Sequence, residues 1–259
     1  MKRLIVLYTS VLALLLSSCS VEPYSGDPDP IDPVETDLKL RQRIVNYLDG
    51  DVVTETFVYD GDKLTSINGS DTSVITYNYE GDLLTQIIDA AAAGNLLTTN
   101  LAYDSQERLI NYRMTTDDEV LEYEFSYNTD GSITRTFYFG GKENSTGASG
   151  ESILTFQNEQ LVKETKDDGQ IITYAYDDQK SSYLGIANIK TINLVSVDFN
   201  GYIDSSVNNL LTATITENGT DFVDEKYEYT YNEAGYPVTA TYYLEGELDS
   251  ELEFVYESL

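Results

Sequence analysis

Residues 121–133 read Leu-Glu-Tyr-Glu-Phe-Ser-Tyr-Asn-Thr-Asp-Gly-Ser-Ile, and the rest of the chain varies this pattern. Apolar residues at 121, 123, 125 and 127 alternate with polar ones. This period of two is typical of an antiparallel strand with one face on a core and the other in water. Asn and Gly in the next four residues suit the positive φ angles of tight turns. The stretch therefore predicts one strand and the turn of a hairpin.

The same unit recurs along the chain as an aromatic residue followed by Asp, Asn, Gln or Glu. We call these aromatic residues the anchors: Tyr59, Tyr79, Tyr103, Tyr127, Phe156, Tyr176, Tyr231 and Tyr256. Successive anchors are 20 to 29 residues apart, except for one interval of 55. Each shorter interval accommodates two strands and two connections. The repeat therefore predicts an all-β antiparallel meander of successive hairpins.

We expect about 14 to 16 strands in one strongly twisted sheet, curled into an open or barrel-like form. The anchors and the aromatic residues two positions before them are predicted to face a single core. A closed sheet of this many strands is too wide for side chains to fill, which favours partial closure, flattening or an internal plug.

The amino-acid composition excludes several classes of function. The 259 residues include 45 Asp and Glu against 15 Lys and Arg, which gives a formal net charge of −30. Such a polyanion repels phosphate backbones, so we expect no nucleic-acid partner. With no His and one Cys, the chain lacks the residues for His-based triads, zinc sites or thiol redox motifs. We expect no enzyme activity, no metal and no cofactor.

The N-terminus predicts export and lipidation. Two basic residues precede the apolar stretch 4–16, which has the length of a signal-peptide core. Leu16-Ser17-Ser18-Cys19 then resembles the lipobox of bacterial lipoproteins, which implies cleavage before Cys19 and a diacylglycerol on its thiol. Residues 1–18 are thus predicted to be a lipoprotein signal peptide. The alternative is an ordinary signal peptide in which this Cys is incidental.

Residues 19–37 form a predicted acidic, Pro-rich linker, because they carry four of the five prolines and almost no apolar mass. The spaced Asp27, Asp29 and Asp32 lack the Gly and Glu of an EF-hand, which favours a solvated tether over a calcium site. Ser20 follows the Cys, where Asp would resemble an inner-membrane retention signal. The resemblance thus implies the outer membrane.

Two stretches carry a further resemblance. Residues 127–133 and 231–238 are similar to the Tyr-Asp (YD/RHS-like) repeat of large bacterial surface and toxin-shell proteins. Residues 38–259 as a whole resemble a Gram-negative lipoprotein family of unknown function with a porin-like fold. Phe156-Gln157, Tyr79-Glu80 and the turn 104–108, which lacks Gly, depart from the pattern. We interpret these departures as drift in a structural repeat.

The region 38–259 is predicted to be a single repeat-built β-domain with an irregular insertion at 178–210. Residues 178–193 are expected to be a loop or short helix covering an end or edge of the sheet. Val195, Val197 and Phe199 alternate towards Asn200-Gly201, which predicts one more hairpin.

Tyrosines outside the anchor phase are the candidate binding residues, namely Tyr138, Tyr202 and Tyr243. Exposed rings of this kind stack on sugars, although the absence of Trp weakens a carbohydrate site. Acidic turns such as 117–119 could bind a divalent cation weakly but lack ligand spacing. No pair of carboxylates is singled out for glycoside hydrolysis.

The sequence favours a lipid-anchored outer-membrane protein that acts as a non-catalytic surface binding or adhesion module, with a glycan or protein partner. An envelope structural or assembly protein without a small ligand is the first alternative, and a glycoside-acting enzyme the second. A true porin is disfavoured, because one face of the predicted strands is densely acidic where a membrane barrel needs an apolar band.

Overall fold

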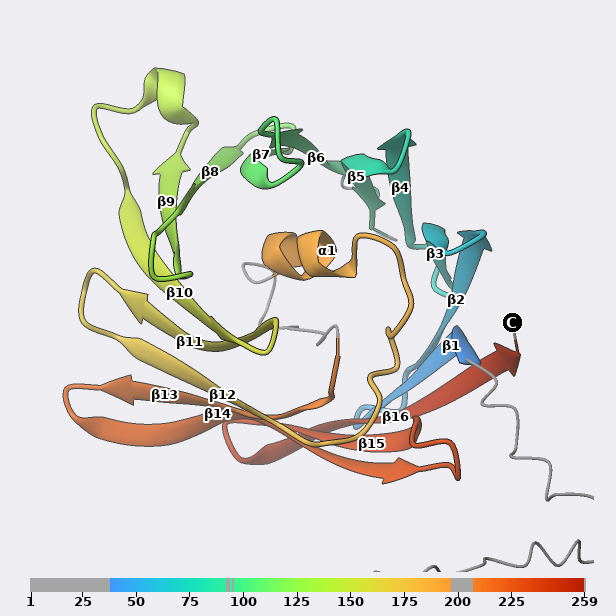
Figure 1. Ribbon diagram of the computed structural model, residues 1–259. Coiled ribbons are helices and arrows are strands. Elements are labelled where there is room, and N and C mark those ends of the chain that lie inside the picture. The colour runs from blue at the N-terminus through green and yellow to red at the C-terminus, as the bar shows by residue number, and fades with distance from the viewer. Residues whose placement is uncertain (1–37, 92–93, 95, 197–206, 259) are drawn as a thin grey trace, which may run out of the picture. The chain divides into compact units, whose positions relative to one another are not determined.

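Sixteen antiparallel strands pair in chain order, and the last strand closes onto the first to complete a barrel (Figure 1). The computed structural model describes residues 38–91, 94, 96–196 and 207–258. The strands are β1 (Leu38–Tyr47), β2 (Val52–Asp60), β3 (Lys63–Gly69), β4 (Val74–Glu80), β5 (Leu83–Ala90), β6 (Leu96–Tyr103), β7 (Leu109–Thr115), β8 (Val120–Tyr127), β9 (Ile133–Phe139), β10 (Gly150–Gln157), β11 (Gln160–Lys166), β12 (Ile171–Tyr176), β13 (Leu210–Glu217), β14 (Thr220–Tyr231), β15 (Pro237–Leu244) and β16 (Glu247–Ser258). The predicted meander is confirmed, and the sheet is closed.

The inner and outer faces of the barrel have opposite polarity. On β8, Tyr123 and Phe125 are buried, and they belong to a core cluster of inward residues contributed by strands all around the barrel. The alternate positions of the strands face outward and are mostly polar; examples are Thr54, Thr56, Asn78, Asn100, Glu122, Glu124, Thr136, Thr214, Lys226, Glu228, Thr241, Glu251 and Glu253. A membrane-spanning barrel has an apolar outer band instead. The predicted inward aromatic layer is confirmed.

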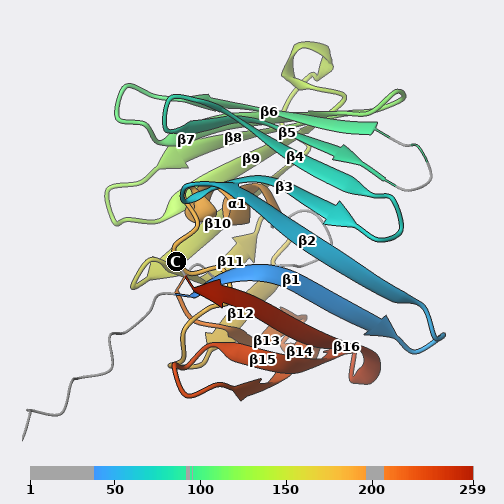
Figure 2. The same ribbon diagram turned by 90° about the vertical axis from the view of Figure 1, so that its right-hand side faces the viewer.

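All eight anchors lie at one end of the barrel, which we call the anchor end. Each anchor stands at the end of an even-numbered strand, and antiparallel order brings these strand ends together (Figure 2). Short turns join each even-numbered strand to the next strand here, except after β12 and after the last strand. The chain therefore supplies covalent links between β2 and β3, between β4 and β5, and so on, but none between β1 and β2 at this end.

Tyrosine hydroxyls bridge those other pairs of strands. Six anchors donate a hydrogen bond to a backbone carbonyl near the start of the preceding strand. The bonds run from Tyr59 to Leu40 (2.8 Å), Tyr79 to Leu64 (2.9 Å), Tyr103 to Leu84 (2.5 Å), Tyr127 to Leu109 (2.9 Å), Tyr176 to Leu161 (2.7 Å) and Tyr256 to Pro237 (2.8 Å). We call this set of bonds the tyrosine belt.

The bonds of the belt join strands beyond the point where their backbone hydrogen-bond ladder ends. Between β3 and β4, for example, the paired residues run only from Ser66–Thr76 to Asn68–Val74, so the ladder stops short of Tyr79. The register with β5 shifts immediately before this anchor, between Asn78 and Tyr79, because β5 carries one extra residue, Thr85, as a bulge. The aromatic ring spans the splayed strands, and its hydroxyl satisfies a carbonyl that the ladder does not reach.

Two anchors depart from the belt. Phe156 has no hydroxyl, and the ladder between β9 and β10 continues to the pair Ile133–Leu154. Tyr231 donates instead to the Asp177 carboxylate, at the point where the chain leaves β12 for the insertion. Both departures lie where the insertion occupies the barrel.

The insertion enters the barrel. Its helix α1 (Ile189–Ser196) lies inside the ring of strands in Figure 1, with Ile192 and Val195 in the core cluster. The backbone N–H of Ala187 donates to the Asp62 carbonyl, and the Asn188 amide donates to the Asp82 carbonyl, both in turns of the anchor end. A 3-10 turn, η1 (Lys142–Asn144), lies in the connection between β9 and β10.

The sequence prediction for this region is therefore partly wrong. Val195 does not begin a hairpin but belongs to α1, while Val197 and Phe199 lie outside the described residues. Of the two expected positions of the loop or short helix, an edge of the sheet is excluded, because a closed barrel has no edge to protect, whereas the bonds to Asp62 and Asp82 agree with a position at one end of the sheet. The insertion instead fills a lumen too wide for side chains, and Ile189, Ile192 and Val195 recur at the three-residue spacing of one helix face.

Residues 1–37, which include the predicted signal peptide, Cys19 and the linker, lie outside the described residues. In the described part of the chain, no helix is long and apolar enough to cross a bilayer.

We expect Tyr79→Phe to lower the free energy of unfolding by about 1 kcal/mol, because it removes one net hydrogen bond of the belt. Urea denaturation measures this. Tyr138→Phe is the matched control, since its hydroxyl bonds to Glu124 on the outer face. Equal losses in the two variants would contradict the structural role of the belt.

Candidate functional site

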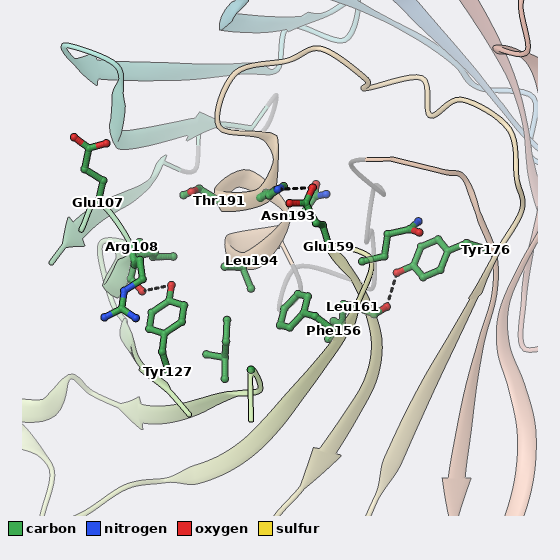
Figure 3. Close-up of a pocket in the computed structure, with 15 residues that line it drawn as sticks. Glu107, Arg108, Tyr127, Phe156, Glu159, Leu161, Tyr176, Thr191, Asn193 and Leu194 are labelled. Atoms are coloured by element: carbon green, nitrogen blue, oxygen red, sulfur yellow. Dashed lines mark hydrogen bonds and ion pairs between the residues drawn. The ribbon is translucent and has the colours of Figure 1, made fainter. Parts of the chain in front are cut away.

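A large cavity lies inside the barrel near the anchor end, between α1 and strands β7 to β12 (Figure 3). Its volume is about 520 Å³, within the usual size range of small-molecule sites. The walls are mainly apolar and aromatic, from Leu109, Tyr127, Ile133, Phe156, Leu161, Tyr176 and Leu194. The polar lining residues are Glu107, Arg108, Glu159, Gln160, Lys190, Thr191 and Asn193. We call this space the rim cavity.

Charged residues of the rim cavity are held by neighbours. The Arg108 guanidinium bonds to Asp104 (Nη2 to Oδ2, 2.6 Å) and lies over the Tyr127 ring, 4.4 Å from its centroid. Lys190 of α1 forms an ion pair of 2.7 Å with Glu159 in the β10–β11 turn. Both pairs are substantially exposed, so they can rearrange at low cost when a molecule enters.

The tyrosines around the cavity are poor acids. Burial raises the pKa of the Tyr176 and Tyr127 hydroxyls above the ordinary value. It also raises the pKa of Tyr103 to about 12, although a hydrogen bond from Thr191 of α1 works in the opposite direction. These hydroxyls stay protonated at neutral pH and act as hydrogen-bond donors, which does not suit them to act as general bases.

Two of the three turns that border the cavity place side-chain-bearing residues in the left-handed backbone region. Glu107 has φ 60°, at the position held by Gly131 (φ 87°) and Gly235 (φ 82°) in the equivalent turns. Asn158 and Glu159, in the β10–β11 turn, have φ 50° and 68°. For residues other than Gly this conformation costs energy, and such strain concentrates at functional sites.

Several departures from the repeat thus meet at one place. Phe156 interrupts the tyrosine belt, Glu107 and Asn158 replace turn glycines, and Lys190 of the insertion contacts Glu159. From the sequence alone, we interpret Phe156 and the turn without Gly as drift in a structural repeat. The signal was present in the chain, but only the closed barrel brings these turns and α1 together.

The sequence-predicted binding tyrosines do not converge. Tyr138 of β9 and Tyr243 of β15 are half-buried on the outer face, and each lies beside a Lys–Glu pair. The Tyr138 hydroxyl bonds to Glu124 (3.2 Å) and the Tyr243 hydroxyl to Glu228 (3.4 Å). Five strands separate β9 from β15 in chain order. Tyr202 and Cys19 lie outside the described residues.

Acidic turns do not assemble into a cation site in the described part of the chain. Residues 38–91, 94, 96–196 and 207–258 contain no group of three or more His, Cys, Asp or Glu side chains placed to hold a metal ion.

Comparison with known proteins identifies the fold. The chain is similar to the crystal structure of a porin-like protein from Bacteroides vulgatus, with a TM-score of 0.57 and 13% identity over 86% of this chain and 100% of that one. A porin-like protein from Bacteroides uniformis gives a TM-score of 0.51 and 14% identity, over 84% and 96% of the two chains. The porin-like fold expected from the resemblance is confirmed.

No protein-family profile matches the chain, and no curated protein is similar to it. The kinship with Tyr-Asp repeats and with the lipoprotein family stays a prediction.

Glu107→Gly is expected to raise the free energy of unfolding by up to about 1 kcal/mol, because it relieves left-handed strain. The reciprocal change Gly131→Glu, in the equivalent turn, is expected to lower it by about 1–2 kcal/mol. Thermal and urea unfolding of both variants check this. If Gly131→Glu is as stable as the unchanged protein, the two turns do not differ in strain.

Proposed function

We propose that the protein is a non-catalytic binding protein of the outer membrane, tethered by a lipid on Cys19, that holds a small and largely apolar molecule in the rim cavity. The observation that carries this proposal is the convergence on one cavity of Phe156, Glu107 and Glu159, the last from the β10–β11 turn with its left-handed residues. A repeat that merely built a barrel would have no reason to place its departures there.

The chemistry of the cavity favours binding over catalysis. Its walls are hydrocarbon and aromatic rings, and its tyrosines are held protonated by burial. The ion pairs Arg108–Asp104 and Lys190–Glu159 balance charge at the polar side. An apolar body with a small polar group matches this lining.

The polarity of the barrel supports a tether beside the membrane. Glu122, Glu124 and Glu228 occupy the outer face, where a bilayer would impose a large penalty on charge. We therefore propose that the barrel lies in water and that attachment depends on the predicted lipid. The porin-like fold and the signal-peptide pattern support the outer membrane as its location.

Binding can be tested with N-phenyl-1-naphthylamine, an uncharged dye whose fluorescence rises in apolar sites. We expect the purified protein to enhance dye fluorescence saturably, and Leu194→Trp to abolish the effect by filling the rim cavity. Thr136→Trp, on the outer face of β9, should leave it unchanged. Dye binding that is absent, or equal in both variants, would contradict the proposed site and favour an envelope structural role.

The lipid anchor is tested separately. Cys19→Ala should abolish incorporation of radiolabelled palmitate in cells and release the protein from the membrane fraction. Cys19→Ser is the matched control with nearly the original size, and it should behave in the same way because it also lacks the thiol. Persistent labelling of either variant would overturn the lipoprotein assignment.

A further inference from the structure

A second cavity, of about 200 Å³, lies against β8 to β11 and shares no lining residue with the rim cavity. Its lining consists of Tyr123, Arg135, Phe137, Gly150, Glu151, Ser152, Glu164, Lys166 and Asp167. Lys166 is the last residue of β11 and Asp167 begins the β11–β12 connection, which is at the end opposite the anchors. We call this space the ladder cavity, and its site goes beyond the function proposed above.

A buried ion pair forms one side of the ladder cavity. Arg135 Nη2 lies 2.7 Å from Glu164 Oε1, and Arg135 Nε donates to the Ser152 hydroxyl at 3.2 Å. The Arg135 and Glu164 side chains are 8% and 2% exposed. Burying such a pair costs about as much as its attraction returns, so packing alone does not explain it. The pair does supply strong, fixed hydrogen-bonding groups next to a cavity.

An aromatic ladder forms another side. The rings of Tyr112 and Tyr123 stack at 4.6 Å between centroids, and those of Tyr123 and Phe137 at 4.9 Å. The next residue in register, on β10, is Gly150, and a side chain built there would meet no atom within 4 Å. The row of stacked rings therefore ends at Phe137, and the space that a side chain at position 150 would occupy is open.

The charged residues that line the ladder cavity determine which kind of ligand it can bind. Arg135 and Lys166 donate hydrogen bonds, whereas the carboxylates of Glu164, Glu151 and Asp167 accept them. An anion would meet three carboxylates, and a cation would meet two positive side chains. An uncharged molecule with several hydroxyls satisfies both kinds of group, because each hydroxyl donates and accepts.

From this arrangement we propose that the ladder cavity binds a single neutral sugar ring. The apolar C–H face of the sugar takes the place of the missing side chain beside Phe137. Its hydroxyls donate to Glu164 and accept from Arg135 and Ser152.

The test uses saturation-transfer-difference NMR on the full-length purified protein with glucose, galactose, mannose and N-acetylglucosamine as probes. We expect transfer to the ring protons of at least one of these sugars. Gly150→Leu should abolish it, because the added side chain fills the space beside Phe137 without a clash. Thr155→Leu, an outward position on the same strand, is the control and should retain transfer.

Transfer to none of the four sugars, or transfer that survives Gly150→Leu, would overturn the proposal. A circular dichroism melt verifies that Gly150→Leu is folded, and Phe137→Leu provides a second variant that removes the ring and should also abolish transfer. Leu194→Trp fills the other cavity and should leave sugar binding unchanged, so failure of one proposed site is distinguishable from failure of the other.

Discussion

A closed barrel of sixteen strands encloses more space than inward side chains can fill, and the main features of this protein answer that constraint. Aromatic residues on the inner face reduce the space, and α1 occupies part of the remainder. The lumen is therefore filled mainly by apolar and aromatic groups, with a few buried charged residues such as Arg135 and Glu164 among them. The rim cavity and the ladder cavity lie in space that the rings and the helix leave open.

The tyrosine belt keeps the anchor end closed around that lumen. Short turns link six of the sixteen neighbouring strand pairs at this end, and hydroxyl-to-carbonyl bonds such as Tyr79 to Leu64 bridge six more. The belt is interrupted only near the insertion among the described strands, at Phe156 and Tyr231. The tyrosine belt and the candidate binding site are therefore related, because the rim cavity lies where Phe156 interrupts the belt.

The sequence predicted the meander, its polarity and the anchor positions, since period-two alternation and Asx–Gly turns are local signals. It predicted a loop or short helix at 178–193 but not the continuation of α1 to Ser196 inside the lumen, because Val195 alternates with its neighbours as a strand residue does. The rim cavity was missed for a similar reason. Glu107 and Phe156 are 49 residues apart in the chain, and barrel closure alone places them on one cavity.

The central claim is that the aromatic face of the strands is buried inside the barrel and the acidic face lies in water. Cysteine labelling in intact envelopes tests it most directly, using a membrane-impermeant maleimide on the variants Glu124→Cys and Phe125→Cys, adjacent residues of β8. In a protein that also carries a lipid on Cys19, we expect rapid labelling of the first variant and protection of the second. Protection at 124 with rapid labelling at 125 would show a membrane-embedded barrel with a wet lumen and would contradict the account.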